Sequence, residues 1–159
     1  MKTIKLNLYN IDELSKEAQE KAHIDYISSK YFEYFWIDES IKSVKAFCNA
    51  FNCDLVDYQL STYNHSFLKS DINNDCIRGM KKKNLPAKDS ELTGYIIDFV
   101  MLESFYKHYK GDIIEAFNIA LNDGLKAIIN DMECQLLFEY FIEHSQANGY
   151  QYTIDGSYY

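Results

Sequence analysis

The sequence predicts an α+β fold in which a small, mainly antiparallel sheet packs against several helices, including one long C-terminal helix. Two patterns favour this class. Short stretches alternate polar and apolar residues, as strands do, and longer segments repeat apolar residues every three or four positions, as helices do. The chain has 159 residues, 47% of them hydrophobic and 25% charged, which suits a globular protein with its own core. We find no linker and no internal repeat, and therefore expect a single domain over residues 1–159.

Three patterns account for the first third of the chain. Residues 3–9 alternate apolar and polar side chains, which predicts a half-buried strand. Residues 12–29 carry apolar residues four positions apart and begin near Asn10 and Asp12, either of which suits a helix N-cap, so they predict an amphipathic helix. Residues 35–51 place apolar side chains at steps of four and three, which predicts a second helix with one buried stripe.

The middle of the chain changes from helical spacing to alternation. Residues 56–60 and 63–67 each alternate, which predicts two antiparallel strands joined near residues 61–62. Residues 71–90 are polar and contain the only proline, so they predict a long connection. Residues 94–101 fit either a buried strand or the start of a helix, and their bulky and β-branched side chains favour a strand.

The C-terminal third is dominated by one helical pattern. Residues 112–146 keep apolar side chains at helical spacing, which predicts a single long helix that begins at Asp112. Gly124 in its middle either bends this helix or lets a neighbour pack closely. Asn148-Gly149 is a typical stop signal, and Asp155-Gly156 between two aromatic stretches predicts a tight hairpin turn.

The chain is acidic, and the acidity is unevenly distributed. Lys and Arg number 16 and Asp and Glu 24, for a formal net charge of −8. Residues 1–102 hold 13 basic and 15 acidic residues (−2), whereas residues 103–159 hold 3 and 9 (−6). With Arg78 as the only arginine, the sequence lacks the basic face that binds phosphate backbones, so we expect no direct contact with nucleic acid. The acidic C-terminal third either suits a basic protein partner or serves only to keep the protein in solution.

Motifs that carry catalysis or hold a cofactor are missing from the sequence. There is no GxxxxGK[ST] or GxGxxG phosphate loop and no GxSxG nucleophile turn. The four histidines never lie three or four positions apart, and the four cysteines have neither zinc-site nor CxxC spacing. Residues 71–75 begin like a calcium loop, but Cys76 and Lys82 stand where a glycine and a glutamate are needed. We therefore expect a non-enzymatic protein with no cofactor and no metal, whose cysteines are mostly buried free thiols.

Nothing in the sequence predicts an association with membranes. The most apolar run, residues 95–102, is eight residues long and contains Asp98, so it is too short to span a bilayer. The first ten residues lack the uninterrupted apolar stretch of a secretory signal. We therefore expect the protein in the reducing environment of the cytoplasm.

Aromatic side chains crowd residues 31–36, where five of six residues are aromatic and the only tryptophan occurs. One face of a helix or strand cannot bury them all, so either they close the core between the first two helices or some of them bind a partner. The residues that we expect at a partner-binding surface are aromatic residues of this segment and acidic residues of the last third: Tyr31, Tyr34, Trp36, Glu133, Glu139 and Glu143. A second aromatic group ends the chain: Tyr150, Tyr152, Tyr158 and Tyr159. Either group would also suit a homodimer or a ligand platform.

Several short stretches resemble a group of small acidic proteins of bacteriophages and prophages, which often carry an antitoxin-type label. The stretches are residues 14–22, Asp25-Tyr26, Tyr34-Phe35-Trp36 with Asp38-Glu39-Ser40, Phe47-Cys48, Asp57-Tyr58 and the terminal Asp155-Gly156. The resemblance includes no catalytic motif and transfers no site residue. It implies a phage protein in the cytoplasm of a host cell, where small acidic proteins block host enzymes or defence systems, including CRISPR nucleases.

These observations predict a non-enzymatic phage-type inhibitor that binds a host defence, nuclease or toxin protein through an acidic and aromatic surface. Two alternatives remain open. Tyrosines that stack on a base, together with phosphate held by Lys81–Lys83, would make a nucleotide-binding sponge. His65 and Asp57, acting as acid and base, would make an enzyme with a dispersed site.

Overall fold

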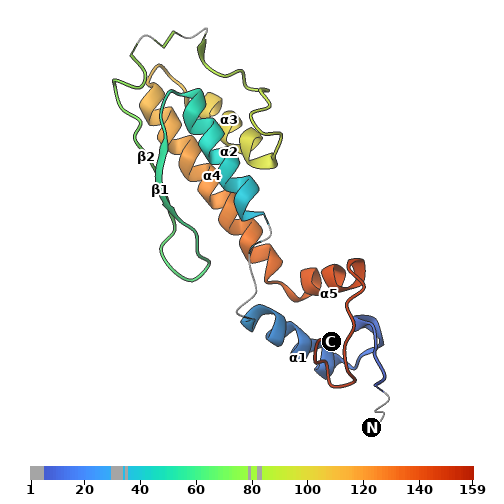
Figure 1. Ribbon diagram of the computed structural model, residues 1–159. Helices are drawn as coiled ribbons and strands as arrows, with labels where there is room; N and C mark the ends of the chain where they lie inside the picture. Colours follow the sequence, from blue (N-terminus) through green and yellow to red (C-terminus); the bar gives the residue numbers. More distant parts are fainter. Residues whose placement is uncertain (1–5, 30–33, 35, 79, 82–83) are drawn as a thin grey trace, which may run out of the picture. The chain divides into compact units, whose positions relative to one another are not determined.

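The computed structural model describes residues 6–29, 34, 36–78, 80–81 and 84–159. In this part of the chain, a short 3-10 helix is followed by helices and a two-stranded antiparallel sheet (Figure 1), which confirms the α+β class with a long helix near the C-terminus. In chain order the elements are η1 (Ile11–Glu13), α1 (Lys16–Ser28), α2 (Ile37–Ala50), β1 (Leu55–Gln59), β2 (Phe67–Ser70), α3 (Ile96–His108), α4 (Ile113–Gln135) and α5 (Phe138–Ala147).

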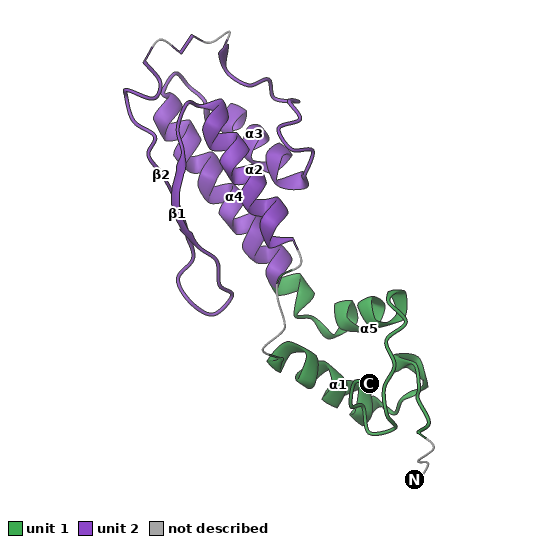
Figure 2. Cartoon of the chain, in the orientation of Figure 1, with its two compact units in different colours: residues 1–34, 133–159 green, residues 35–132 purple. Residues whose placement is uncertain are grey.

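The chain forms two compact units (Figure 2). Unit 1 combines residues 1–34 with residues 133–159, and unit 2 comprises residues 35–132. Unit 1 carries 5 basic and 10 acidic residues (−5) and unit 2 carries 11 and 14 (−3), so the smaller unit holds most of the excess negative charge. The single domain over residues 1–159 remains a prediction.

The core of unit 2 lies among α2, α3 and α4 (Figure 1). The ring centroid of Phe51 is 4.7 Å from that of Phe105 and 5.3 Å from that of Phe117, and Phe47 is 5.1 Å from Phe117. All four rings are fully buried. Burial of one such side chain stabilises a fold by about 1.5–3 kcal/mol, so this cluster is a main source of the stability of unit 2.

Gly124 serves the close packing of α4 against α3. A Cβ added to Gly124 would lie 2.7 Å from Cγ of Met101, which is closer than real Cβ atoms approach. Of the two predicted roles for this glycine, the structure confirms close packing. Asp112 caps α4 as predicted, because its Oδ1 accepts a hydrogen bond from the Glu115 amide at 3.0 Å.

The β1–β2 hairpin confirms the first predicted strand and corrects the second. Tyr58 lies opposite Leu68 in the antiparallel register, and β2 begins only at Phe67, so the prediction of a strand over residues 63–67 is wrong. The reason lies in two serines: Oγ of Ser66 accepts a hydrogen bond from the Ser61 amide and donates one to the Ser61 carbonyl, at 2.9 and 2.7 Å. These bonds stabilise a wide loop between the strands instead of a two-residue turn.

The strand favoured over residues 94–101 is wrong, and the alternative, the start of a helix, is confirmed, because α3 begins at Ile96 within this segment. The buried carboxylate of Asp98 accepts hydrogen bonds from the amides of Thr93 and Gly94, at 2.5 and 2.9 Å. A carboxylate in the first turn is favourable at the positive end of a helix. Packing against α2 and α4 overrides the strand preference of the β-branched side chains.

Unit 1 packs η1, α1, α5 and the C-terminal turn around a small core. Its fully buried members are Ile11, Leu14, Ala18, Ala22, Phe141 and Tyr152. Tyr9 and Tyr152 exchange two backbone hydrogen bonds of 2.9 Å in an isolated bridge. Of the strand predicted over residues 3–9, residues 3–5 lie outside the described range and residues 6–8 are irregular, so among the described residues the pairing is limited to Tyr9.

The C-terminal signals predicted from glycine are confirmed. Asn148 caps α5, and Gly149 follows with φ +63°. In the turn at Asp155-Gly156, the Thr153 amide donates to the Ser157 carbonyl at 2.9 Å. The two aromatic stretches therefore fold back on each other as predicted.

The prediction of one continuous helix over residues 112–146 is wrong at one place. α4 ends at Gln135 and α5 begins at Phe138, and Leu137 between them is extended, with ψ 146°. Neither glycine nor proline lies at this break. Instead, the Leu136 carbonyl oxygen, which a continuous helix would bond to the Tyr140 amide, lies 2.9 Å from Nε2 of His23 in α1.

Candidate partner-binding surface

The predicted aromatic members of the surface have different positions. Tyr31 lies outside the described residues. Tyr34 is only 6% exposed, so its side chain belongs to the interior, as the core alternative for this segment expects. Trp36 is 48% exposed directly before α2, with its ring centroid 6.4 Å from that of Tyr95. Of these three, Trp36 alone presents a described aromatic surface, and it belongs to unit 2.

The predicted acidic members all lie on the surface of unit 1. Glu133 is near the end of α4, and Glu139 and Glu143 are one turn apart on α5. All three are exposed, and none forms an ion pair within the part of the chain that the structure describes. Residues 133–159 contain four acidic residues and no lysine or arginine, so the charge of this surface is not compensated locally.

A contiguous series of aromatic rings lies on α5 and in the C-terminal segment of the same unit. We call it the ring row, and it consists of Tyr140, His144, Tyr150 and Tyr158. Tyr140 and His144 are stacked one helical turn apart, with centroids 5.7 Å apart and planes at 11°. Tyr150 meets His144 edge-on at 5.5 Å and Tyr158 at 5.3 Å. Glu143 lies three positions after Tyr140 and is therefore its neighbour on the helix surface.

Three rings of the ring row are half-buried and one is exposed. Tyr140, His144 and Tyr150 are half-buried, whereas Tyr158 is 65% exposed. Tyr152, which the aromatic pattern also suggested for the surface, is instead buried and shares a 2.9 Å hydrogen bond with Ser145. Because Tyr150 packs against the core of unit 1, the middle of the row is held in place before any partner arrives.

His144 is the only titratable nitrogen base in the ring row, and its surroundings favour the neutral form. Burial lowers the pKa of its imidazole. Nδ1 lies 3.3 Å from the Asn148 side-chain nitrogen, and Nε2 lies 3.3 Å from the Tyr150 hydroxyl. These partners fit an imidazole that accepts at Nδ1 and carries its proton on Nε2. These surroundings therefore favour an uncharged ring row at neutral pH.

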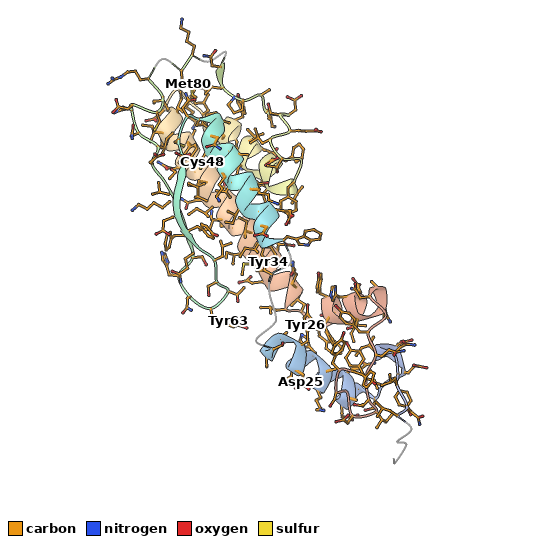
Figure 3. All side chains as sticks on the ribbon, viewed as in Figure 1. Asp25, Tyr26, Tyr34, Cys48, Tyr63 and Met80 are labelled. Carbon is orange, nitrogen blue, oxygen red and sulfur yellow. The ribbon has the colours of Figure 1, made fainter. Side chains whose placement is uncertain are left out.

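Tyr26 on α1, labelled in Figure 3, contacts both the core of unit 1 and the ring row. Its ring centroid is 5.2 Å from that of Phe141 and 6.3 Å from that of His144. Burial, with smaller contributions from Tyr140 and other tyrosines, raises the pKa of Tyr26 to about 12. Its phenol therefore stays protonated and acts as a packing element of unit 1.

The carboxylate of Asp155 has a structural role. It accepts hydrogen bonds from Lys21 Nζ at 2.8 Å, Thr153 Oγ1 at 2.5 Å and Ser157 Oγ at 3.0 Å. The bond from Lys21 is the largest cause that lowers the pKa of this carboxyl, followed by those from Thr153 and Ser157. Of the four acidic residues in 133–159, three thus remain for a partner.

The pair suggested for a dispersed catalytic site is not joined in the structure. Oδ1 of Asp57 accepts a 2.9 Å hydrogen bond from the Tyr58 amide. His65 is exposed in the loop between β1 and β2, and its ring lies 6.3 Å from that of Phe67. Lys82 and Lys83 of the suggested phosphate-binding loop lie outside the described residues.

The sequence missed one cluster with the residue types of a catalytic triad. Oγ of Ser104 donates to Oδ2 of Asp123 at 2.7 Å, and His108 Nδ1 lies 2.9 Å from the Ser104 carbonyl. Lys126 Nζ binds the other oxygen of Asp123 at 2.9 Å and is the first cause of the lowered pKa of that carboxyl. Nδ1 of His108 also lies 3.5 Å from Ser104 Oγ. Its shorter contact with the Ser104 carbonyl requires a proton on Nδ1, so this nitrogen does not accept the serine proton and the cluster lacks the order that activates a nucleophile. It connects α3 to α4.

Within the described residues, no group of three or more His, Cys, Asp or Glu side chains is arranged to hold a metal ion. In the segment that begins like a calcium loop, Oδ1 of Asp71 accepts a hydrogen bond from the Asp54 amide at 2.7 Å, and Asp75 forms an ion pair with Arg78 at 2.9 Å.

All four cysteines are free thiols. The expectation of burial holds for Cys48 and Cys53, whereas Cys134 is exposed. Among the described helices, none combines the length and apolarity that crossing a bilayer requires.

Comparison with known proteins adds no relative. No family model matches the chain, and neither the curated proteins nor the solved structures contain a match.

Proposed function

We propose that this protein is a non-enzymatic inhibitor that binds a basic surface of a partner protein through the acidic and aromatic surface of unit 1. The main observation in support of this proposal is that Glu133, Glu139 and Glu143 are exposed and have no ion-pair partner among the described residues. Complementary charge steers association and adds specificity, so such a surface favours a partner rich in lysine or arginine.

The kind of partner follows from charge and from the resemblance to phage proteins. Proteins that bind nucleic acid have the required basic surface, and nucleases, toxins and defence proteins belong to this class. We propose a host defence protein, nuclease or toxin, whose basic groove the acidic surface would occupy in place of nucleic acid. Inhibition then requires no chemical step in this chain.

The experiment is affinity purification from host lysate with mass spectrometry, followed by a salt titration of the purified complex and an activity assay of the partner. We expect binding that weakens between 50 and 300 mM salt, because exposed charge pairs are screened over about 8–10 Å at physiological ionic strength. The test variant is Glu133→Gln/Glu139→Gln/Glu143→Gln, which should reduce affinity at least tenfold, about 1.4 kcal/mol.

A matched control has the same change in net charge elsewhere. Asp89, Glu91 and Glu115 are exposed residues of unit 2, and Asp89→Asn/Glu91→Gln/Glu115→Gln also removes three negative charges. We expect this variant to bind nearly as the natural protein does. Equal losses in the two variants would show that net charge alone drives association, and salt-independent binding would contradict the electrostatic mechanism.

A further inference from the structure

We propose that the ring row selects arginine over lysine in the bound partner, because a guanidinium group can stack on the rings while its N–H groups reach the carboxylates of α5. This inference rests on the proposed function and names the side chain that the same surface recognises.

The ring geometry favours a flat cation. Tyr140 and His144 lie nearly parallel, at 11°, and Tyr150 and Tyr158 continue the row edge-on. Guanidinium is planar and weakly hydrated, so it stacks on aromatic faces at little desolvation cost, whereas an ammonium group is compact and strongly hydrated. A row of rings with a fixed orientation therefore discriminates between two side chains of the same charge.

The carboxylates supply the second part of the recognition. Glu143 follows Tyr140 by three positions and is therefore the neighbour of this ring on the helix surface, and Glu139 lies one turn before Glu143. Arginine presents five N–H donors in a fork that fits a carboxylate with two hydrogen bonds. A guanidinium group stacked on the Tyr140 ring can donate hydrogen bonds to Glu143 at the same time. The compact ammonium group of lysine can contact either the ring or the carboxylate, but not both in this way.

The charges around the ring row allow a cation to bind there. Burial favours the neutral form of His144, which adds an aromatic ring rather than a repelling charge to the row. Lys21, a cation of the same unit, is engaged by Asp155 at 2.8 Å. The occupant that fits the ring row is therefore an arginine-bearing segment of a protein.

The test uses three synthetic peptides as probes: acetylated, amidated hexa-arginine, hexa-lysine and hexa-glutamate. Affinities are measured by calorimetry with the full chain, and the site is located by amide chemical-shift changes. We expect hexa-arginine to bind about fivefold more tightly than hexa-lysine, as one exposed cation–π contact of about 1 kcal/mol provides. Hexa-glutamate should not bind. The largest shift changes should lie on α5 and in residues 150–158.

Two variants at the stacking position test the inference. Tyr140→Leu keeps an apolar side chain but removes the ring, and it should bring the ratio of the two affinities close to one while hexa-lysine binding stays within twofold. Glu143→Gln removes the exposed carboxylate beside this ring and should also lower the ratio, so it keeps the test valid if Tyr140→Leu disturbs folding. The control is Tyr63→Leu in the loop of the β1–β2 hairpin (Figure 3), where an 83% exposed tyrosine lies outside the ring row and the ratio should not change.

The outcomes separate this inference from the proposed function. Equal affinity of hexa-arginine and hexa-lysine for the natural protein, or a preference that persists in both Tyr140→Leu and Glu143→Gln, overturns the arginine selection and leaves acidic docking in place. Shift changes confined to unit 2 also overturn it. If neither basic peptide binds, the acidic surface does not attract cationic segments, and both the proposed function and the inference fail.

Discussion

Gly156 approaches the backbone of α1 so closely that a Cβ placed on it would lie 2.1 Å from the carbonyl oxygen of Ala18. Its φ of +85° is in the left-handed region that favours glycine. One turn further along α1, Nζ of Lys21 lies 2.8 Å from both Asp155 Oδ2 and Ser157 Oγ. The C-terminal turn is thus docked on α1, and this docking holds Tyr158 at the end of the ring row.

The first prediction concerns this docking. Gly156→Ala should lower the free energy of unfolding by about 2–4 kcal/mol, because it combines backbone strain with a clash against backbone atoms that cannot move aside. Urea denaturation followed by tyrosine fluorescence and circular dichroism measures the effect. The control is Gly149→Ala, where φ is +63° but no atom lies within 4 Å of the added Cβ, so about 1 kcal/mol is expected. Equal losses at both sites would contradict the close packing.

The second prediction concerns the charge of Asp155. Lys21 is the largest cause of the lowered pKa of this carboxyl, so Lys21→Met should raise that pKa towards the ordinary range. The side-chain ¹³C shift of Asp155, followed through an acid titration, measures the change. Lys16→Met is the control, because Lys16 is also on α1 but has no contact with Asp155 among the described residues. A pKa that stays low without Lys21 would assign the effect to Thr153 and Ser157.

The third prediction concerns the break between α4 and α5. His23 offers a hydrogen-bond donor to the Leu136 carbonyl, and its ring packs 5.4 Å from those of Phe138 and Phe141. Removal of both contacts in His23→Ala should destabilise unit 1 by about 1–3 kcal/mol and increase the helical population of Leu137, seen in its ¹³Cα shift. His23→Gln keeps a donor of similar reach and should lose less.

A second variant at the break tests the same idea from the opposite direction. Leu137 occupies the N-cap position of α5 without a side-chain cap and is 53% exposed. Leu137→Asp adds a good cap and should stabilise the broken form by about 1 kcal/mol, because aspartate accepts hydrogen bonds from the first free amides of a helix. If His23→Ala leaves the Leu137 shift extended, the local sequence rather than α1 causes the break.

The elements that the sequence predicts well are those with a strong local pattern. The stripe over residues 37–50, the cap at Asp112 and the turn at Asp155-Gly156 depend on neighbours within a few positions, and all three are confirmed. The α4–α5 break depends on His23, which lies 113 residues from Leu136, so no local pattern reveals it. For α3 the sequence leaves a strand and a helix start open and favours the strand, since the strand preference of its β-branched side chains is reversed only by the helices packed against it.

The candidate site also has residues that the local sequence predicts and residues whose positions depend on distant contacts. Glu139 and Glu143 are predictable because charge is read directly from composition and exposed carboxylates need no tertiary argument. The stacking of Tyr140 on His144 requires knowledge that α5 is helical, and their spacing of four positions is the signal that was available. The burial of Tyr34 and Tyr152 follows from contacts that an aromatic count cannot distinguish from exposure.

The last prediction concerns pH. The pKa of His144 is lowered in the folded state by burial, so in the range between that pKa and the ordinary value of 6.5 the unfolded chain binds more protons than the folded one. The free energy of unfolding should therefore be constant above about pH 7 and fall as the pH decreases through this range. Urea midpoints between pH 5 and 8 measure the slope. The pKa of Asp155 is lowered as well, but the stability that this carboxyl contributes is lost only in more acidic solution, below its ordinary range, so the two effects are separable.

The variant His144→Gln should flatten the slope between pH 5 and 7. Protonation of His144 in the natural protein should weaken hexa-arginine binding in the same range, because a cation in the ring row repels guanidinium. A pH-dependent stability that persists in His144→Gln would assign the slope to another group and remove the reason for placing a neutral imidazole in the ring row.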